Sequence, residues 1–147
     1  MTDPVFVDTN VLLYTFDAAD PVKQKLASAW YAALWRSGAG RISYQVLQEF
    51  YSKIRQKWPS ASDGARAVVR ELLVWHPAAV NGTLLELAWN IQDRYRFSFW
   101  DSLIVAAAKV SSCRYLLTED LHAMQVVEGL KVLNPFQQRP DSILSSN

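Results

Sequence analysis

PVFVDTNVLLY, residues 4–14, joins a short apolar segment directly to a segment that can begin a helix. Residues 4–8 are rich in valine and phenylalanine, which is typical of a short buried strand. Thr9 and Asn10 are residue types that open a helical turn. A strand that runs straight into a helix is the first unit of an α/β fold, and here it leaves Asp8 at the end of the strand.

The same alternation of strands and helices continues along most of the chain. Further helix starts are predicted at Asp20–Pro21, Ser43, Ser60–Asp63 (a capping box), Asn81 and Ser98, and further strands over residues 41–43, 115–118 and 130–134. The helix after Ser98 is apolar nearly all round, so we expect it to be buried. This order predicts an α/β layer fold with a mainly parallel sheet of about four to five strands. Sites in such folds collect where strands end and helices begin.

Composition excludes several classes of protein. Of the 147 residues, 50% are hydrophobic and 20% are charged, so the chain is not intrinsically disordered. The single Cys113 excludes a disulfide framework and, with His76 and His122, is too little for a zinc site. The net charge of +1 gives no global attraction to nucleic acid. With no basic leader and no long apolar run, we expect a cytoplasmic protein without a membrane segment.

Four acidic residues fall at positions that are unusual for surface charges. Asp8 ends the first strand, Glu49 flanks the apolar stripe of a helix, Asp101 lies in the first turn of the most apolar helix, and Asp120 follows a strand. If folding brings them together, their mutual repulsion favours a hard divalent cation, which prefers oxygen ligands. Such an ion supports in-line displacement at phosphorus.

Each acid also has a purely structural explanation. Asp8 can cap the turn that follows it, and Asp101 can form a capping box with Ser98. Glu49 can be a solvated helix residue, and Asp120 a loop residue after a strand. Taken one at a time, these alternatives stay open, whereas a shared site accounts for all four residues together.

Five segments resemble PIN-domain nucleases, and more closely the VapC-like ribonuclease toxins of bacterial toxin–antitoxin pairs. They are FVDTNVLLY (6–14), LQEF (47–50), FWDSLIVAAA (99–108), LLTEDL (116–121) and NPF (134–136). The resemblance implies a three-layer PIN-like domain over residues 1–136, and we expect a loose polar tail over 137–147. It also implies cleavage of RNA phosphodiester bonds with one or two Mg²⁺ or Mn²⁺ ions, an antitoxin partner and a homodimer. One departure is Ala123-Met124, where many relatives have a glycine.

The resemblance also assigns roles to residues. Asp8, Glu49, Asp101 and Asp120 become the catalytic, metal-binding acids. Asn10, Thr118 and Glu119 become residues that orient them, and the sequence leaves open whether Glu119 supports or replaces Asp120. Independently of the resemblance, Lys53, Arg94 and Arg96 are candidates for binding RNA phosphates, and an ordinary solvated helix face is the alternative for Lys53.

Two other functions compete with this one. A haloacid-dehalogenase-like phosphohydrolase would use Asp8 as nucleophile, but such enzymes need a second Asp where this chain has Asn10. A non-catalytic PIN-like module that binds RNA or protein is the alternative, but a binding module gains nothing from four gathered acids.

Overall fold

The computed structural model describes residues 3–144 and contains a five-stranded sheet. The strands are β1 (Val5–Val7), β2 (Gly40–Arg41), β3 (Tyr115–Leu117), β4 (Val126–Val127) and β5 (Leu130–Leu133). Their order is β2-β1-β3-β5-β4, and every neighbouring pair is parallel except β4 and β5. The predicted α/β fold with a mainly parallel sheet is confirmed.

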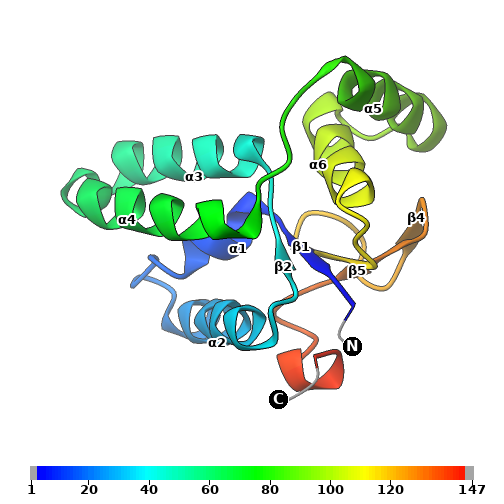
Figure 1. Cartoon of the computed structure of the whole chain (residues 1–147). Helices are drawn as coiled ribbons and strands as arrows, with labels where there is room; N and C mark the ends of the chain where they lie inside the picture. The colour runs from blue at the N-terminus through cyan, green and yellow to red at the C-terminus, as the bar shows by residue number, and fades with distance from the viewer. Residues whose placement is uncertain (1–2, 145–147) are drawn as a thin grey trace.

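Six α-helices flank this sheet. They are α1 (Thr9–Tyr14), α2 (Pro21–Ser37), α3 (Tyr44–Lys57), α4 (Ser62–Leu72), α5 (Gly82–Tyr95) and α6 (Phe99–Val110). Figure 1 shows α1 to α4 on one side of the strands, and α5 and α6 on the other. Short 3₁₀ turns occupy Pro59–Ala61, Leu73–Trp75 and Pro140–Ser142.

Most predicted helix starts are confirmed, because capping is a local interaction. Four side chains accept the backbone N–H three residues on, as N-caps do: Asp20, Ser43, Asn81 and Ser98. The predicted stop at Gly38 is also confirmed, since this residue is left-handed with a φ of 69°.

Two local predictions were wrong, and one strand was not identified from the sequence. The Ser60–Asp63 capping box does not form, because Pro59 begins a 3₁₀ turn and α4 starts only at Ser62 without a side-chain cap. The strand predicted over 41–43 is Gly40–Arg41 instead, since Ser43 is already used as the cap of α3. Strand β4 was missed because it is only two residues long.

The polar segment after Pro135 does not form a loose tail as far as Leu144. The indole N–H of Trp30 donates to the carbonyls of Pro135 (3.1 Å) and Gln138 (3.0 Å), and Leu144 is only 7% exposed. The rest of the predicted tail, residues 145–147, lies outside the described residues.

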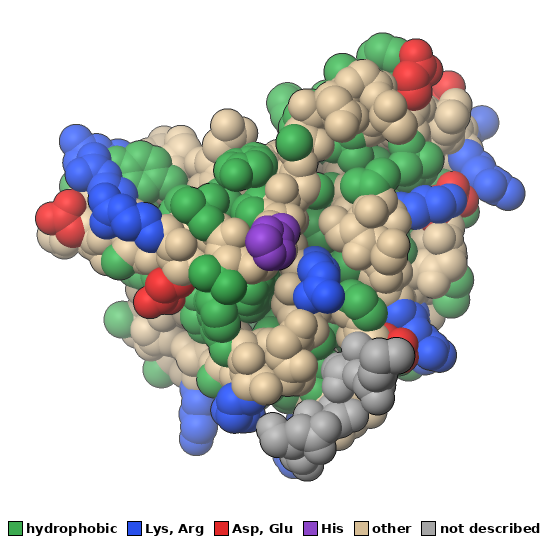
Figure 2. Space-filling view, in the orientation of Figure 1, with side chains coloured by type: hydrophobic (Ala, Val, Ile, Leu, Met, Phe, Trp, Pro, Cys, Tyr) green, Lys and Arg blue, Asp and Glu red, His purple; other side chains and the backbone are tan. Residues whose placement is uncertain are grey.

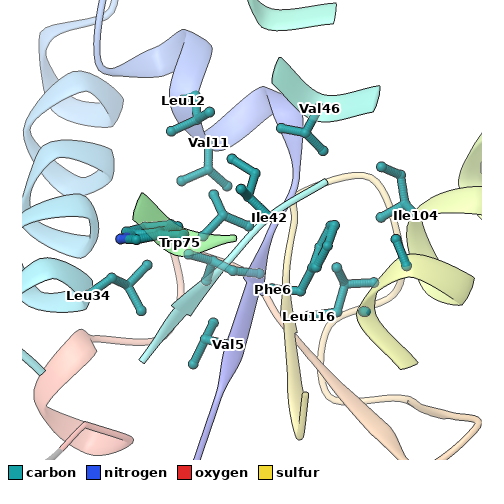
Figure 3. Close-up of a cluster of buried hydrophobic side chains, with 14 of the residues drawn as sticks. Val5, Phe6, Val11, Leu12, Leu34, Ile42, Val46, Trp75, Ile104 and Leu116 are labelled. Carbon is teal, nitrogen blue, oxygen red and sulfur yellow. The ribbon is translucent and has the colours of Figure 1, made fainter. Parts of the chain in front are cut away.

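The hydrophobic core lies on both faces of the sheet. In Figure 3, Phe6 of β1 points toward Ile104 of α6, whereas Leu34 of α2 and Trp75 lie on the other side of the strand. Only glycine fits at position 40, because the Trp75 ring lies directly against its Cα and a Cβ at this position would overlap the ring. Within residues 3–144, no helix combines the length and apolarity needed to cross a membrane.

The parallel strands β1 and β3 end side by side. Val7 is in register with Leu117, and the N–H of Asp8 donates to the Leu117 carbonyl at 3.0 Å. Asp8 and Thr118, the residues after these two strands, are therefore neighbours although they are far apart in sequence. This shared edge of the sheet positions the candidate site.

Candidate active site

Asp8 is held by its neighbours on three sides. Its Oδ1 accepts the N–H of Thr9 at 2.7 Å, and its Oδ2 accepts the hydroxyl of Thr118 at 2.8 Å and the amide of Asn10 at 3.4 Å. Asp8 is also the N-cap of α1, which confirms the capping role that was its structural alternative. Because Oδ1 accepts a single hydrogen bond, it retains a lone pair for a further partner.

Thr118 fixes the orientation of the Asp8 carboxylate. Its hydroxyl oxygen accepts the side-chain amide of Asn10 at 3.1 Å and the backbone N–H of Asp120 at 3.0 Å. Both partners can only donate, so the single hydroxyl hydrogen goes to Asp8. Thr118 is completely buried, and its hydroxyl uses its one hydrogen and both of its lone pairs in these three hydrogen bonds.

Asn10 brings Asp120 to Asp8. Its Nδ2 donates to Oδ2 of Asp120 at 3.1 Å and to Oδ2 of Asp8 at 3.4 Å. The two carboxylates share one donor nitrogen, so they lie no more than two hydrogen-bond lengths apart. The convergence predicted from sequence is therefore present for this pair.

Glu49 reaches the same region from α3. Its Oε2 accepts the hydroxyl of Thr9 at 3.0 Å, and its Oε1 accepts the side-chain amide of Gln45 at 3.0 Å. Glu49 is half-buried and is not the fully solvated helix residue that was its structural alternative.

Asp101 enters from the first turn of α6. Its backbone N–H donates to Oγ of Ser98 at 3.1 Å, so Ser98 caps the helix as considered. Burial, followed by the charges of Asp120 and Glu49, raises the pKa of Asp101, while its interaction with Ser98 lowers it. The carboxylate therefore combines a position in a capped helix turn with electrostatic contact to the other acids.

All four acids line one cleft of about 560 Å³. The other lining residues are Thr9, Asn10, Gln45, Gln48, Lys53, Trp100 and Ile104. None of the salt bridges within residues 3–144 includes any of the four acids. On the face drawn in Figure 2, by contrast, Asp and Glu side chains stand apart from one another.

The cluster has a measurable electrostatic cost. Burial raises the pKa of Asp8 to about 6, and the charges of Asp120 and Asp101 add to this shift. The hydrogen bonds from Thr118 and Thr9 act in the opposite direction but do not cancel it. Ionised Asp8 is therefore destabilising in the metal-free fold.

We expect the metal-free protein to lose stability from this group as pH rises. Because the pKa of about 6 in the folded protein lies above the ordinary aspartate pKa of 3.8, the stabilising contribution is complete below pH 4 and is lost by about pH 6. A shift of this size corresponds to about 3 kcal/mol in the free energy of unfolding. Urea unfolding of wild type and Asp8→Asn from pH 4 to 7 measures the contribution of Asp8. The other groups titrate in both proteins, so their effect cancels in the difference between the two free energies of unfolding. A stability difference that does not vary with pH would contradict the shift.

The chemistry of the cleft suits a hard divalent cation. Carboxylate oxygens are the ligands that Mg²⁺ and Mn²⁺ prefer. Within the described part of the chain, no three acidic, histidine or cysteine side chains stand close enough to chelate one ion as they are. Mg²⁺ usually keeps several waters and is held by only one or two carboxylates, so the residues present fit such an ion.

Glu119 points away from the cleft. Its Oε2 accepts the ammonium of Lys23 at 3.0 Å, and the same ammonium lies 3.4 Å from the Tyr14 hydroxyl. Its backbone N–H donates to Oδ1 of Asn10 at 3.4 Å. Asp120 lines the cleft and Glu119 does not, so the structure separates these two adjacent acids by position.

The three predicted cations lie in different places. Lys53 lines the cleft, one helical turn after Glu49 on α3. Arg94 forms a salt bridge with Glu128 at 3.2 Å, and Arg96 is the exposed C-cap of α5. Neither arginine lines the cleft, and the end of α5 contacts Glu128 through Arg94 and Tyr95.

Sequence reasoning missed two residues that hold Glu49 and one that borders Asp101. Thr9 and Gln45 donate to Glu49, and the four-residue spacing of Gln45 and Glu49 on one helix was the available signal. Trp100 lines the cleft beside Asp101, and the only sequence feature that could have indicated it is its position directly before that acid.

One family model matches most of the chain, and two solved structures share its fold. The family model described as PIN domain matches residues 5–129. VapC20 of Mycobacterium tuberculosis, a sarcin–ricin loop cleaving toxin, has 24% identity and a TM-score of 0.60, covering 76% of this chain and 86% of that one. A toxin–antitoxin complex from Klebsiella pneumoniae has 16% identity and a TM-score of 0.64, covering 89% and 97%. Among curated proteins, none matches significantly.

Proposed function

The chain belongs to the PIN domain family, and from this premise we propose that it is a divalent-metal-dependent endoribonuclease. We further propose that it is the toxin of a toxin–antitoxin pair and is inhibited by a separate antitoxin protein. RNA as substrate implies action in the cytoplasm. A homodimer stays an expectation from the family resemblance.

The single observation that carries the proposal is the gathering of four carboxylates without a salt-bridge partner in one cleft. Burial of these carboxylates, with a smaller contribution from their neighbouring charges, raises the pKa values of Asp8 and Asp101, so keeping them ionised costs folding free energy. A protein that only needed to fold or to bind a partner would gain nothing from it. Active sites commonly carry such destabilising charge because function requires it.

Asp8, Asp101 and Asp120 are the residues proposed to hold one or two Mg²⁺ or Mn²⁺ ions, with Glu49 at the side of α3. When bound, such an ion lowers the pKa of water and neutralises charge on phosphate oxygens. Thr118 and the N–H of Thr9 hold the Asp8 carboxylate in place, and Asn10 holds Asp120 beside it. Lys53 lines the cleft, and its proposed role is to contact an RNA phosphate.

Two solved neighbours support the class of substrate and partner. VapC20 is a toxin that cleaves the sarcin–ricin loop, and the Klebsiella chain belongs to a toxin–antitoxin complex. Both share the fold of this chain at low identity, so we extend only the general features to it: RNA as substrate and a protein inhibitor as partner.

Incubation of the purified chain with end-labelled RNA tests the proposal. We expect endonucleolytic cleavage with Mg²⁺ or Mn²⁺ and none with excess chelator, with products carrying a 5′-phosphate and a 3′-hydroxyl. A panel of tRNA, rRNA fragments and unstructured RNA covers the substrate classes. RNA that is bound but left intact under every metal condition would favour the non-catalytic binding module instead.

A further inference from the structure

Trp100 occupies an unusual position for a large aromatic side chain. It is the second residue of α6, directly before Asp101, and its side chain lines the acidic cleft. Trp100 is 62% exposed, although burial of such a ring would contribute about 2 kcal/mol or more to folding. The exposed indole is therefore available to a ligand in the cleft that the four acids line.

Exposure alone does not distinguish this residue, because Trp89 is 47% exposed as well. Trp89 lies on α5, however, and no residue of that helix lines the cleft. Position beside the acids is what separates Trp100 from an ordinary exposed tryptophan.

The indole is presented from a rigid support. Residues 102–108 of α6 are buried in the core, which fixes the helix. The ring of Phe99 contacts Trp100 edge-on, with the centroids 5.3 Å apart and the planes at 67°. A flat ring held in this way needs little further ordering when a planar partner binds.

The surroundings of Trp100 favour a nucleic acid over a protein partner. Apart from the acids, five of the seven described residues that line the cleft are of polar types, and the two large apolar ones are Trp100 and Ile104. A protein-docking patch would have a contiguous apolar centre. A nucleobase needs only one flat aromatic face, and stacking of this kind is tolerant of sequence.

The charge of the cleft strengthens this argument. Four acids line it, and Lys53 is the one lysine or arginine among its lining residues within the described part of the chain. The overall charge of +1 adds little attraction for phosphates. RNA that approaches this cleft therefore needs a source of affinity other than its backbone charge.

We propose that Trp100 stacks on an unpaired base of the RNA next to the phosphate that is cleaved, and so positions the substrate. This inference rests on the proposed ribonuclease function and adds a substrate-binding residue to it. It implies that the bound segment is single-stranded at that base, because a base within a helix presents no free face.

The test compares Trp100→Ala, Trp100→Phe and the control Trp89→Ala, each combined with Asp101→Asn so that RNA stays intact. Binding of a fluorescein-labelled single-stranded RNA is followed by anisotropy, without added metal. We expect about ten- to hundredfold weaker binding for Trp100→Ala, but near-unchanged binding for Trp100→Phe and Trp89→Ala. A duplex of the same sequence should respond to none of the three.

The same three variants with Asp101 intact are then compared in cleavage. We expect Trp100→Ala to raise KM more than it lowers kcat, because stacking acts before and during the reaction. Equal binding by Trp100→Ala and the parent, or an equal loss on the duplex, would overturn the stacking role. A wild-type chain that cuts no RNA would refute the proposed function, while the binding comparison would still decide the role of Trp100.

Discussion

Replacing Asp101 by Asn is expected to lower RNA cleavage by roughly a hundred- to thousandfold, the scale on which single charge-stabilising groups act in enzymes. The reason is the loss of one of the carboxylates proposed to hold the metal ion. Stability is expected to change in the opposite direction. Asp101 is half-buried near Asp120 and Glu49, so removing its charge relieves repulsion.

The substitution leaves the local fold intact. The contact that caps α6 runs from the backbone N–H of Asp101 to Ser98, and an Asn keeps that N–H. Steady-state cleavage together with urea unfolding measures both effects on one variant. A structural residue would lose activity and stability together, whereas lower activity with equal or higher stability identifies a functional residue.

Glu119→Gln is the matched comparison for this prediction. Glu119 is bound to Lys23 outside the cleft, so we expect its loss to change cleavage less than about threefold and stability by about 1 kcal/mol or less. Asp120→Asn should resemble Asp101→Asn in activity. If Glu119→Gln lost as much activity as Asp101→Asn, Glu119 would belong among the catalytic acids.

The parts of the fold that the sequence predicts well are those fixed by local chemistry. Asp20, Ser43, Asn81 and Ser98 each cap a helix through a contact three residues away. Such contacts depend mainly on residues that are close in sequence. The failed capping box at Ser60 shows the limit, because the preceding Pro59 favours a 3₁₀ turn that moves the start of α4.

Strand β4 was not identified from the sequence for a different reason. Its two residues pair with β5 across a tight turn in which Glu128 and Gly129 both have positive φ. Two residues carry no periodicity that could reveal a strand. The pairing exists only because β5 is already in place at the edge of the sheet.

In the candidate site, too, some positions could be predicted from the sequence and others depend on how the helices pack. Residues that follow strands, such as Asp8 and Asp120, could be predicted to converge because parallel strands end at one edge. The contact of Thr9 with Glu49 could not be predicted, since it depends on how α3 packs beside α1. Arg94 was a reasonable phosphate-binding candidate by its distance from Asp101 in sequence, but in the fold it lies in the last turn of α5 and forms a salt bridge with Glu128.

A chain that stops at Phe136 is expected to lose about 2–4 kcal/mol in the free energy of unfolding, from the lost burial of Leu144 and the lost hydrogen bonds. The truncation removes the Gln138 carbonyl that accepts the Trp30 indole N–H, and the Gln138 side chain that accepts the Asn134 N–H at 2.8 Å. It also uncovers part of Trp30, which is completely buried in the full chain.

Urea unfolding of residues 1–136 and of the full chain measures this loss, which is a large share of a typical domain's stability of about 5–15 kcal/mol. Leu144→Ala should reproduce part of the effect, since Leu144 is 7% exposed. Gln137→Ala, at an exposed position in the same segment, should stay within about 0.5 kcal/mol of wild type. Equal stability of the truncated and full chains would place the domain boundary at residue 136, as the sequence alone predicts.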